Sequence, residues 1–308
     1  MSTPLSGASS SLPLAATWSR LRTFLAVVDT GSVAAAGEAL TVTPPAVSAA
    51  VRALEHALGT ALLERAGRGV RPTAAGRTFA DYSRSLLGLL EEAGAAVRDA
   101  EHARLRIGAV ATASEYVLPG LMASFVAARP GVEVSMTVLP RDDLFSAAVH
   151  HEVDLVVAGR PPRGSGLRSL ATRPNRLVVV GAPDLDADPR AATWLLPGAG
   201  SGSRETALTL RDQLGASGTT LTLGTTGAVI AATRVGLGVS LMHEDAVRQD
   251  LAAGRLVVRP LAGTPLDRAW HLSAWPRAAA ATRSFVAHLT DPDAVGESAF
   301  HTRHPPRG

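Results

Sequence analysis

The N-terminal block (residues 18–77) contains three helical patterns separated by very short turns, and this arrangement limits the possible fold more than any other feature. The first pattern carries apolar residues at helical spacing and ends at "TGS". Those apolar residues are Leu21, Phe24, Leu25 and Val28. "VAAAGEAL" at 33–40 predicts a short second helix, and only "TVT" separates it from a third helix that begins at Pro44. This order predicts a helix-turn-helix, whose last helix enters the DNA major groove by its N-terminus.

The third helix is expected to be amphipathic. Thr43 can cap it, as Ser32 can cap the second helix. Pro44 suits the first helical position, because its missing N–H needs no partner there. The apolar stripe of the third helix, which we expect to face the core, comprises Val47, Val51, Leu54 and Leu58.

Arginines gather around a predicted hairpin that follows the third helix. Gly67 and Gly69 favour a tight turn, and Arg65, Arg68 and Arg71 surround it. The N-terminal block has seven arginines and four acidic residues, an excess equal to the formal net charge of +3 of the whole chain. The chain contains no lysine, which a codon bias toward arginine and alanine explains, although arginine also binds phosphate through paired hydrogen bonds that lysine cannot make. These features predict a basic wing beside the helices.

The sequence from Leu21 to Gly76 resembles the DNA-binding domain of the LysR-type transcriptional regulators. The resemblance needs no gaps and is carried by Phe24, Gly31, Ser32, Ala36, Leu40, Pro45, Ala46, Val47, Ser48, Leu54, Glu55, Leu58, Gly59, Leu63, Arg65, Thr73, Ala75 and Gly76. It implies an all-α winged helix-turn-helix domain at 18–75, double-stranded promoter DNA as a partner, and contact with RNA polymerase. The residues that it places at the DNA are Thr43, Pro44, Pro45, Ser48, Ala49, Arg52, Arg65, Arg68 and Arg71.

The third helix departs from the family pattern at positions that face DNA. The family usually has Gln at the position of Pro44, polar residues at Ala49 and Ala50, and often Arg at Ala35. Since a good base-edge contact gives about 1–3 kcal/mol of discrimination, part of the hydrogen-bonded reading of sequence is expected to be missing. Proline and alanine can still pack on thymine methyl groups, and Ser48 can reach phosphates or bases.

A long helix is expected over 73–102, with the linker itself at 76–103. Its apolar residues alternate at spacings of three and four over three heptads: Phe79, Tyr82, Leu86, Leu89, Ala93, Ala96 and Ala100. Such a seam can pack on its own domain or pair two subunits, and its regularity favours pairing. In the resembled family this helix pairs subunits, which implies a homodimer or homotetramer that reads two half-sites of a palindromic operator.

Residues 104–290 alternate between apolar strands and helices. "LRIGAVA", "VEVSMTVL" and "VDLVVAG", with helices between them, predict a parallel sheet, in which Val132, Val134, Met136 and Val138 share one face. A second series begins at "RLVVVGA". We therefore expect two α/β lobes, the first at about 104–180 and 265–290 and the second at about 181–264. The whole region resembles the periplasmic-binding-protein-like effector domain of LysR regulators, in which a ligand lies between the lobes at strand carboxyl ends.

Polar groups at predicted strand ends indicate an effector site for a small anion, possibly phosphorylated. "TAS" leads into a helix N-terminus, "GAGSGSR" begins another, and two further arginines can close the site. The candidates are Thr112, Ala113, Ser114, Arg141, Arg160, Ser201, Ser203 and Arg204. By family position, Thr112, Arg141 and Arg160 correspond to effector contacts, and Thr226 and Gly227 replace the "NG" of an "NGAV" motif. Together with "GRPP", "WLLPGAGSGSRE" and "RAWHL", this region resembles the regulators of Calvin-cycle (Rubisco) operons.

No pattern predicts catalysis. The chain has no cysteine, and "GAGSGS" fails the spacing of a nucleophile elbow. We expect no enzyme activity, no cofactor and no metal site. Residues 1–17 and 291–308, with His301 and His304, are expected to form disordered tails of a cytoplasmic protein that does not enter a membrane. An alternative is a cytoplasmic dimer that binds a small molecule and keeps a degenerate DNA-binding domain with only non-specific affinity.

Overall fold

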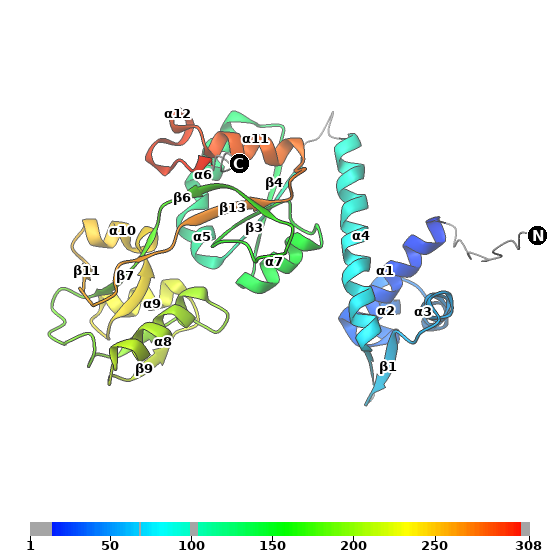
Figure 1. The fold of residues 1–308 in the computed structure, drawn as a ribbon, viewed down its shortest axis with the longest axis horizontal. Helices are drawn as coiled ribbons and strands as arrows, with labels where there is room; N and C mark the ends of the chain where they lie inside the picture. Colours follow the sequence, from blue (N-terminus) through cyan, green and yellow to red (C-terminus); the bar gives the residue numbers. More distant parts are fainter. Residues whose placement is uncertain (1–13, 68, 99–103, 303–308) are drawn as a thin grey trace, which may run out of the picture. The chain divides into compact units, whose positions relative to one another are not determined.

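The computed structural model describes residues 14–67, 69–98 and 104–302 and divides into two compact units, one up to Gly94 and one from Ala95 onward (Figure 1). The N-terminal unit is a winged helix-turn-helix followed by a long helix. Its elements are α1 (Leu14–Thr30), α2 (Val33–Leu40), α3 (Pro44–Leu58), β1 (Leu63–Ala66), β2 (Gly69–Pro72) and α4 (Ala74–Arg98). Helix α1 thus begins inside the segment expected to be a disordered tail. Every helix in the described parts of the chain is too short or too polar to cross a lipid bilayer.

The local signals of the helix-turn-helix are mostly confirmed. Ser32 caps α2 by accepting from the backbone N–H of Ala35 (3.3 Å). Thr43 is the residue that precedes α3, but its side chain makes no capping bond, so the proline start carries that end of the helix. Val47, Val51 and Leu54 are buried in the unit's core. Leu58 is 47% exposed, contrary to expectation, because it lies in the last turn of α3, beyond the core.

The wing is tied to the helices by close backbone contacts. A Cβ on Gly76 would lie 1.9 Å from the carbonyl oxygen of Leu62, so only glycine allows the first turn of α4 to lie against the segment that leads into β1. The Glu55 carboxylate accepts from the backbone N–H of Leu62 (2.8 Å), and the N–H of Val70 donates to the carbonyl of Gly31 (2.9 Å). These contacts fix the hairpin relative to α1 and α3.

Helix α4 presents most of its predicted seam to solvent in the single chain. The side chains of Tyr82, Leu86 and Leu89 are 69%, 57% and 52% exposed. Phe79 instead packs into its own unit, with its ring centre 5.5 Å from that of Phe24, so the seam begins one step later than expected. Ala93 is also exposed; Ala100 lies outside the described residues, as does the side chain of Ala96.

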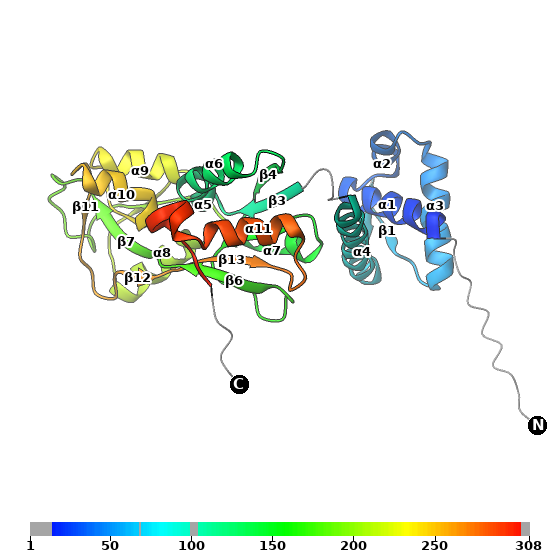
Figure 2. The same cartoon turned by 90° about the horizontal axis from the view of Figure 1, so that it is seen from above.

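The first lobe of the C-terminal unit is built on a six-stranded sheet in the order β14-β6-β13-β5-β3-β4. The strands are β3 (Arg104–Ala109), β4 (Glu133–Val138), β5 (Leu155–Ala158), β6 (Arg168–Arg173), β13 (Trp270–Ala274) and β14 (His301–Thr302). One face packs on α5 (Ala111–Tyr116), α6 (Leu118–Ala128) and α11 (Ala280–Leu289), and the other on α7 (Arg141–Val149) (Figure 2).

The second lobe is centred on β7. Its strands are β7 (Arg176–Gly181), β10 (Ser240–His243), β11 (Val257–Val258) and β12 (Leu266–Asp267), with β8 (Trp194–Leu196) paired to β9 (Thr220–Thr222). Alternate β7 side chains face opposite layers, since Leu177 packs with α8 (Gly202–Leu214) and Val178 with α9 (Thr226–Arg234) and α10 (Glu244–Ala252).

The parallel pairing predicted for the first three strands is confirmed, but the strands that join the two lobes run antiparallel to their neighbours. The pairs β3·β4, β3·β5 and β8·β9 are parallel, but β13 runs antiparallel to β5 and β6, and β7 is antiparallel to all its neighbours. The reason is that β6 leaves the first lobe and β13 returns to it. The chain crosses at 174–175 and at 268–269, so β7 belongs to the second lobe rather than the first.

The face shared by Val134, Met136 and Val138 is covered only in part: Val134 packs against the first lobe's core, whereas Met136 and Val138 are exposed at the edge of the sheet. One further expectation, that of a disordered tail from residue 291, is wrong. The segment after 290 is ordered up to Thr302: α12 (Pro292–Val295) and a 3₁₀ turn (Gly296–Ser298) lead to β14. Phe300 is 1% exposed and packs into the first lobe's core, which holds this segment in place.

Candidate DNA-contact surface and effector cavity

The N-terminal end of α3 is exposed and poor in polar groups. Pro44, Pro45, Ala49 and Arg52 are all exposed, whereas Ser48 is half-buried. Arg52 has no ion pair among the described residues, so its guanidinium is free to bind an external anion. In the described part of this unit, the end of α3 expected to read DNA is therefore formed by proline and alanine side chains and by the guanidinium of Arg52.

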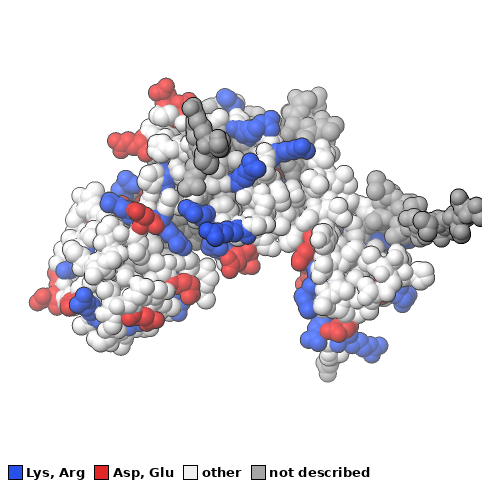
Figure 3. All heavy atoms as spheres, in the orientation of Figure 1, with Lys and Arg blue, Asp and Glu red and all other residues white. Residues whose placement is uncertain are grey.

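The wing adds further cationic groups to the N-terminal unit. Arg65 is exposed and has no ion pair within the described parts of the chain, whereas Arg71 donates through Nε to Glu64 (2.8 Å). Figure 3 shows arginines beside an acidic side chain at the wing end of this unit. Arg68 lies outside the described residues. Since Arg71 is partly neutralised, Arg65 is the stronger candidate for a phosphate contact.

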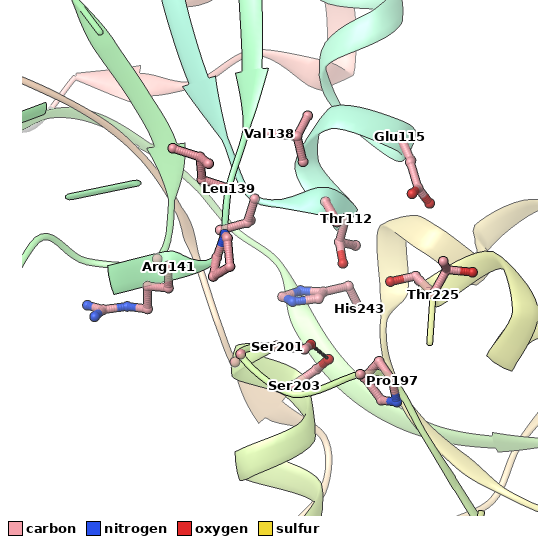
Figure 4. A pocket seen from close by; sticks show the side chains of 18 of the residues that line it. Thr112, Glu115, Val138, Leu139, Arg141, Pro197, Ser201, Ser203, Thr225 and His243 are labelled. Atoms are coloured by element: carbon pink, nitrogen blue, oxygen red, sulfur yellow. Dashed lines mark hydrogen bonds between the residues drawn. The ribbon is translucent and has the colours of Figure 1, made fainter. Parts of the chain in front are cut away.

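A cavity of about 290 Å³ lies between the two lobes of the C-terminal unit (Figure 4). Its walls come from the segments that follow the carboxyl ends of β3, β4 and β5 in the first lobe, and of β8, β9 and β10 in the second. The chain crossing at Arg268–Trp270 closes it. This position agrees with the expected one, because ligands of α/β sheets bind beyond the carboxyl ends of the strands.

Half of the candidate effector residues line this cavity. Those that do are Thr112, Arg141, Ser201, Ser203 and Thr226, and those that do not are Ala113, Ser114, Arg160, Arg204 and Gly227. Ala113 is buried in the first lobe's core, and the Ser114 hydroxyl donates to the carbonyl of Ala111 (2.8 Å). The hydroxyls of Ser201 and Ser203 are hydrogen bonded to each other (2.9 Å) at the start of α8.

Two of the predicted arginines hold loops in place. Arg141 donates to the carbonyl of Arg160 (2.7 Å) and lies over the ring of Phe145, and in Figure 4 its side chain points away from the other labelled groups. Arg204 donates to the carbonyl of Pro197 (2.9 Å) and so braces the "GAGSGSR" loop from behind. Both guanidinium groups have internal partners, which makes them poorer ligand contacts than the sequence suggested.

His243, Arg268 and Trp270 also line the cavity, and the sequence did not indicate them as ligand contacts. His243 ends β10, and its ring stacks on that of Trp270 with 4.5 Å between ring centres. Nη2 of Arg268 lies 3.6 Å from where a Cβ would be on Gly202, the first residue of α8. The "RAWHL" motif contains Arg268 and Trp270, but in the sequence it indicates only the resemblance to a family.

His243 is neutral near pH 7. Burial lowers the pKa of its imidazole to about 4, and the positive charge of Arg268 adds to this effect, while Asp245 opposes it. The ring is packed at the cavity wall and Arg268 is close enough to disfavour a second cation. His243 can therefore act on a ligand as a hydrogen-bonding group without a charge.

A buried carboxylate supports this wall from behind. Asp245 accepts from the indole N–H of Trp270 (2.7 Å) and pairs with Arg173 and Arg248. Burial alone would raise the pKa of Asp245, but Arg173 and the hydrogen bonds from Trp270 and Arg248 hold it below its usual value. Because Arg173 ends β6 and Trp270 begins β13, this carboxylate of α10 joins both crossing strands to the second lobe.

Two family descriptions match this chain. Residues 18–77 match "Bacterial regulatory helix-turn-helix protein, lysR family", and residues 98–292 match "LysR substrate binding domain". The second match covers both lobes up to the start of α12 and includes every residue that lines the cavity.

Similar proteins are transcriptional regulators. The HTH-type transcriptional regulator CfxR of Cupriavidus necator is 33% identical over 278 residues, covering 86% of this chain and 87% of that protein. The RuBisCO operon transcriptional regulator of Allochromatium vinosum is 35% identical over 268 residues, covering 82% and 88%. Among solved structures, ArgP from Mycobacterium tuberculosis has the same fold, with a TM-score of 0.66 at 21% identity over 93% of this chain and 98% of that one.

Proposed function

The chain belongs to the LysR family of transcriptional regulators, and from that premise we propose that it binds promoter DNA as a dimer or tetramer and responds to a small anionic metabolite held between its lobes. The relatives' names make the promoter of a RuBisCO operon the first DNA target to test. An effector that prefers one arrangement of subunits over another would then change how the DNA is held.

The exposed end of α3 and the wing support the proposed DNA contact. Arg52 and Arg65 have no ion pairs among the described residues and can bind phosphates, and Pro44, Pro45 and Ala49 can pack on thymine methyl groups. Because this surface has few polar side chains that could contact base edges, we expect its sequence specificity to depend on contacts with thymine methyl groups and on the shape of the DNA.

The exposed stripe on α4 supports the proposed dimer. Tyr82, Leu86 and Leu89 lie at heptad spacing and are more than half exposed in the single chain. Adjacent large apolar residues in water are unfavourable, and pairing two such helices would bury them. A dimer joined here would present two α3 helices to two half-sites.

The single observation that carries the effector proposal is the Arg268 side chain in the interlobe cavity. It is half-buried, it lies beside the first residue of α8, and it has no ion pair among the described residues. A cation in this position, next to a helix N-terminus and the Ser201 and Ser203 hydroxyls, favours an anionic ligand group.

Footprinting of the full chain on its own upstream DNA and on a RuBisCO operon promoter tests this function. We expect a protected region with two half-sites, whose extent or bending changes when the right anionic metabolite is added. A protein that kept only a degenerate DNA-binding domain would give salt-sensitive, sequence-independent binding and no footprint. Calorimetry that detected binding of neutral aromatic compounds only would contradict the anionic effector.

A further inference from the structure

The side chain of Asn175 determines which ring nitrogen of His243 carries the proton. Its Nδ2 lies 2.7 Å from His243 Nδ1 and donates to the carbonyl of Arg268 (3.1 Å). The reverse orientation of the amide would place its oxygen against that carbonyl, two acceptors with no hydrogen between them. Nδ2 therefore faces His243, whose Nδ1 must accept. The imidazole is then neutral and carries its single proton on Nε2.

The second ring nitrogen of His243 is free to meet a ligand. No hydrogen bond to it occurs within the described parts of the chain, and the ring is part of the cavity wall. Stacking on Trp270 fixes the plane of the ring, and Figure 4 shows it between Thr112 and the pair formed by Ser201 and Ser203. The cavity therefore contains an N–H donor whose position is fixed from two sides.

Among the described residues around His243, Arg268 is the one cation that has no ion pair and can therefore bind a ligand. Arg141 on α7 is bound to a carbonyl, and Asp245 on α10 is paired with Arg173 on β6. Glu115 lines the cavity from α5, where its carboxylate repels an anion. An anionic group is thus directed to Arg268, beside the start of α8.

We propose that His243 is a specificity-determining residue of this cavity: as a neutral imidazole it donates its Nε2–H to an oxygen of a phosphate or carboxylate group whose charge Arg268 holds. The inference rests on the proposed function, in which the cavity takes an anionic effector, and adds the chemistry of recognition. A neutral donor keeps its proton from about pH 5.5 to 8, so recognition does not depend on pH in this range. A neutral donor also lets the cavity bind an anion without a second buried positive charge beside Arg268, which would be costly to desolvate.

Nitrogen NMR of the full chain labelled with ¹⁵N-histidine tests the protonation state without any ligand. The His243 signal, identified by its loss in His243→Gln, should show a proton on Nε2 only, unchanged between pH 5.5 and 7.5. A proton on Nδ1, or a charged ring at pH 6.5, would overturn the proposal.

Sulfate at constant ionic strength is the probe for binding, because it keeps two negative charges over this pH range, and malonate at pH 7.5 separates carboxylate from phosphate-like recognition. Wild-type affinity for sulfate should be constant with pH.

Loss of the donor in His243→Phe should weaken sulfate binding about tenfold, and His243→Gln, whose amide can donate from a similar place, should recover most of the lost affinity. Arg268→Gln should also lose about tenfold or more, whereas Arg163→Gln, an exposed arginine outside the cavity, should bind like the wild type.

The outcomes separate this inference from the proposed function. Equal binding by wild type and His243→Phe, or affinity that falls about tenfold per pH unit above pH 6, would overturn the role of His243 and leave the anion cavity standing. If the wild type bound neither sulfate nor malonate, both the anion cavity and the ligand contact of His243 would be wrong. Thermal unfolding of each variant shows whether a loss of binding reflects a loss of fold.

Discussion

The two proposed recognition surfaces of this chain differ in how their polar groups are positioned. At the start of α3, Pro44, Pro45 and Ala49 are exposed, and Arg52, which has no ion pair among the described residues, is on a flexible side chain. In the cavity, Asn175 and Trp270 fix the ring of His243 from two sides. The DNA-contact surface can therefore change one residue at a time without disturbing the fold, whereas a change in the cavity affects several interacting groups.

We expect the largest effects on stability from two glycine substitutions, one in each unit, which test whether the two units unfold independently. A Cβ on Gly76 would lie 1.9 Å from the carbonyl oxygen of Leu62, and one on Gly218 would lie 1.8 Å from that of Ala192. Backbone must move in both cases. Gly76→Ala and Gly218→Ala should each lower the free energy of unfolding of their own unit by about 3 kcal/mol or more.

Thermal unfolding followed by calorimetry should show each substitution lowering one transition and leaving the other in place. Gly120→Ala is the control, since Gly120 lies in α6 and a Cβ there meets nothing within 4 Å. This change should be neutral or slightly stabilising. A Gly76→Ala variant whose C-terminal unit also lost stability would show that the units do not unfold independently.

Acid should destabilise the C-terminal unit through His243. Its pKa in the folded chain is about 4, below the ordinary value, so between pH 6.5 and 4 the unfolded chain takes up a proton that the folded chain does not. Stability therefore falls as the pH falls through this range, by up to about 3 kcal/mol. The carboxyls of Asp245 and Asp250 have lowered pKa values, and their contribution is lost only at lower pH.

Urea unfolding at pH 6.5 and at pH 4.5 measures this effect. The His243→Gln variant cannot titrate, so its stability should change less between the two values than that of the wild type. An identical loss in both proteins would mean that His243 is accessible to protons in the folded chain and that the cavity wall is less rigid than its contacts indicate.

Local patterns explain why the N-terminal unit was largely predictable. The start of α3 follows from proline at its first position, and the exposed seam of α4 follows from heptad spacing within a single helix. What failed there depends on contacts between elements. Phe79 belongs to the heptad pattern but packs on Phe24, and Leu58 belongs to the apolar stripe but lies beyond the core that would cover it.

The cavity was less predictable because its groups come from distant parts of the chain. Asn175, His243 and Arg268 meet only because β7, β10 and the second crossing lie side by side. Nothing near Arg141 in the sequence indicates that the carbonyl of Arg160 will hold its guanidinium. Strand ends predicted where the cavity lies, but packing decides which side chains at a strand end have no other partner.

At the DNA-contact surface, adding a polar group should create discrimination rather than disturb the fold. Ala49→Arg places a long donor on the exposed side of α3 and should change the preference at one or two base pairs by about 1–3 kcal/mol. Selection from a randomised operator library measures the preference. Ala57→Arg, exposed at the other end of the same helix, is the control and should raise only non-specific affinity. Unchanged preference in Ala49→Arg would show that this residue does not face the groove.

The smallest expected effect distinguishes two arginines of the wing. Arg65 has no ion pair among the described residues, whereas Arg71 is bound to Glu64, so removing Arg65 should cost more DNA affinity than removing Arg71. Each lost phosphate contact should reduce the slope of log affinity against log salt by about 1 and weaken binding by less than about 1 kcal/mol. Titrations at several salt concentrations with Arg65→Ala, Arg71→Ala and Glu64→Gln provide the measurement.

The Glu64→Gln variant is the control for the ion pair. Because it frees Arg71, it should strengthen DNA binding, and it should have no such effect when combined with Arg71→Ala. Equal losses from both arginine variants would mean that DNA displaces Glu64 and that both arginines contact phosphate equally.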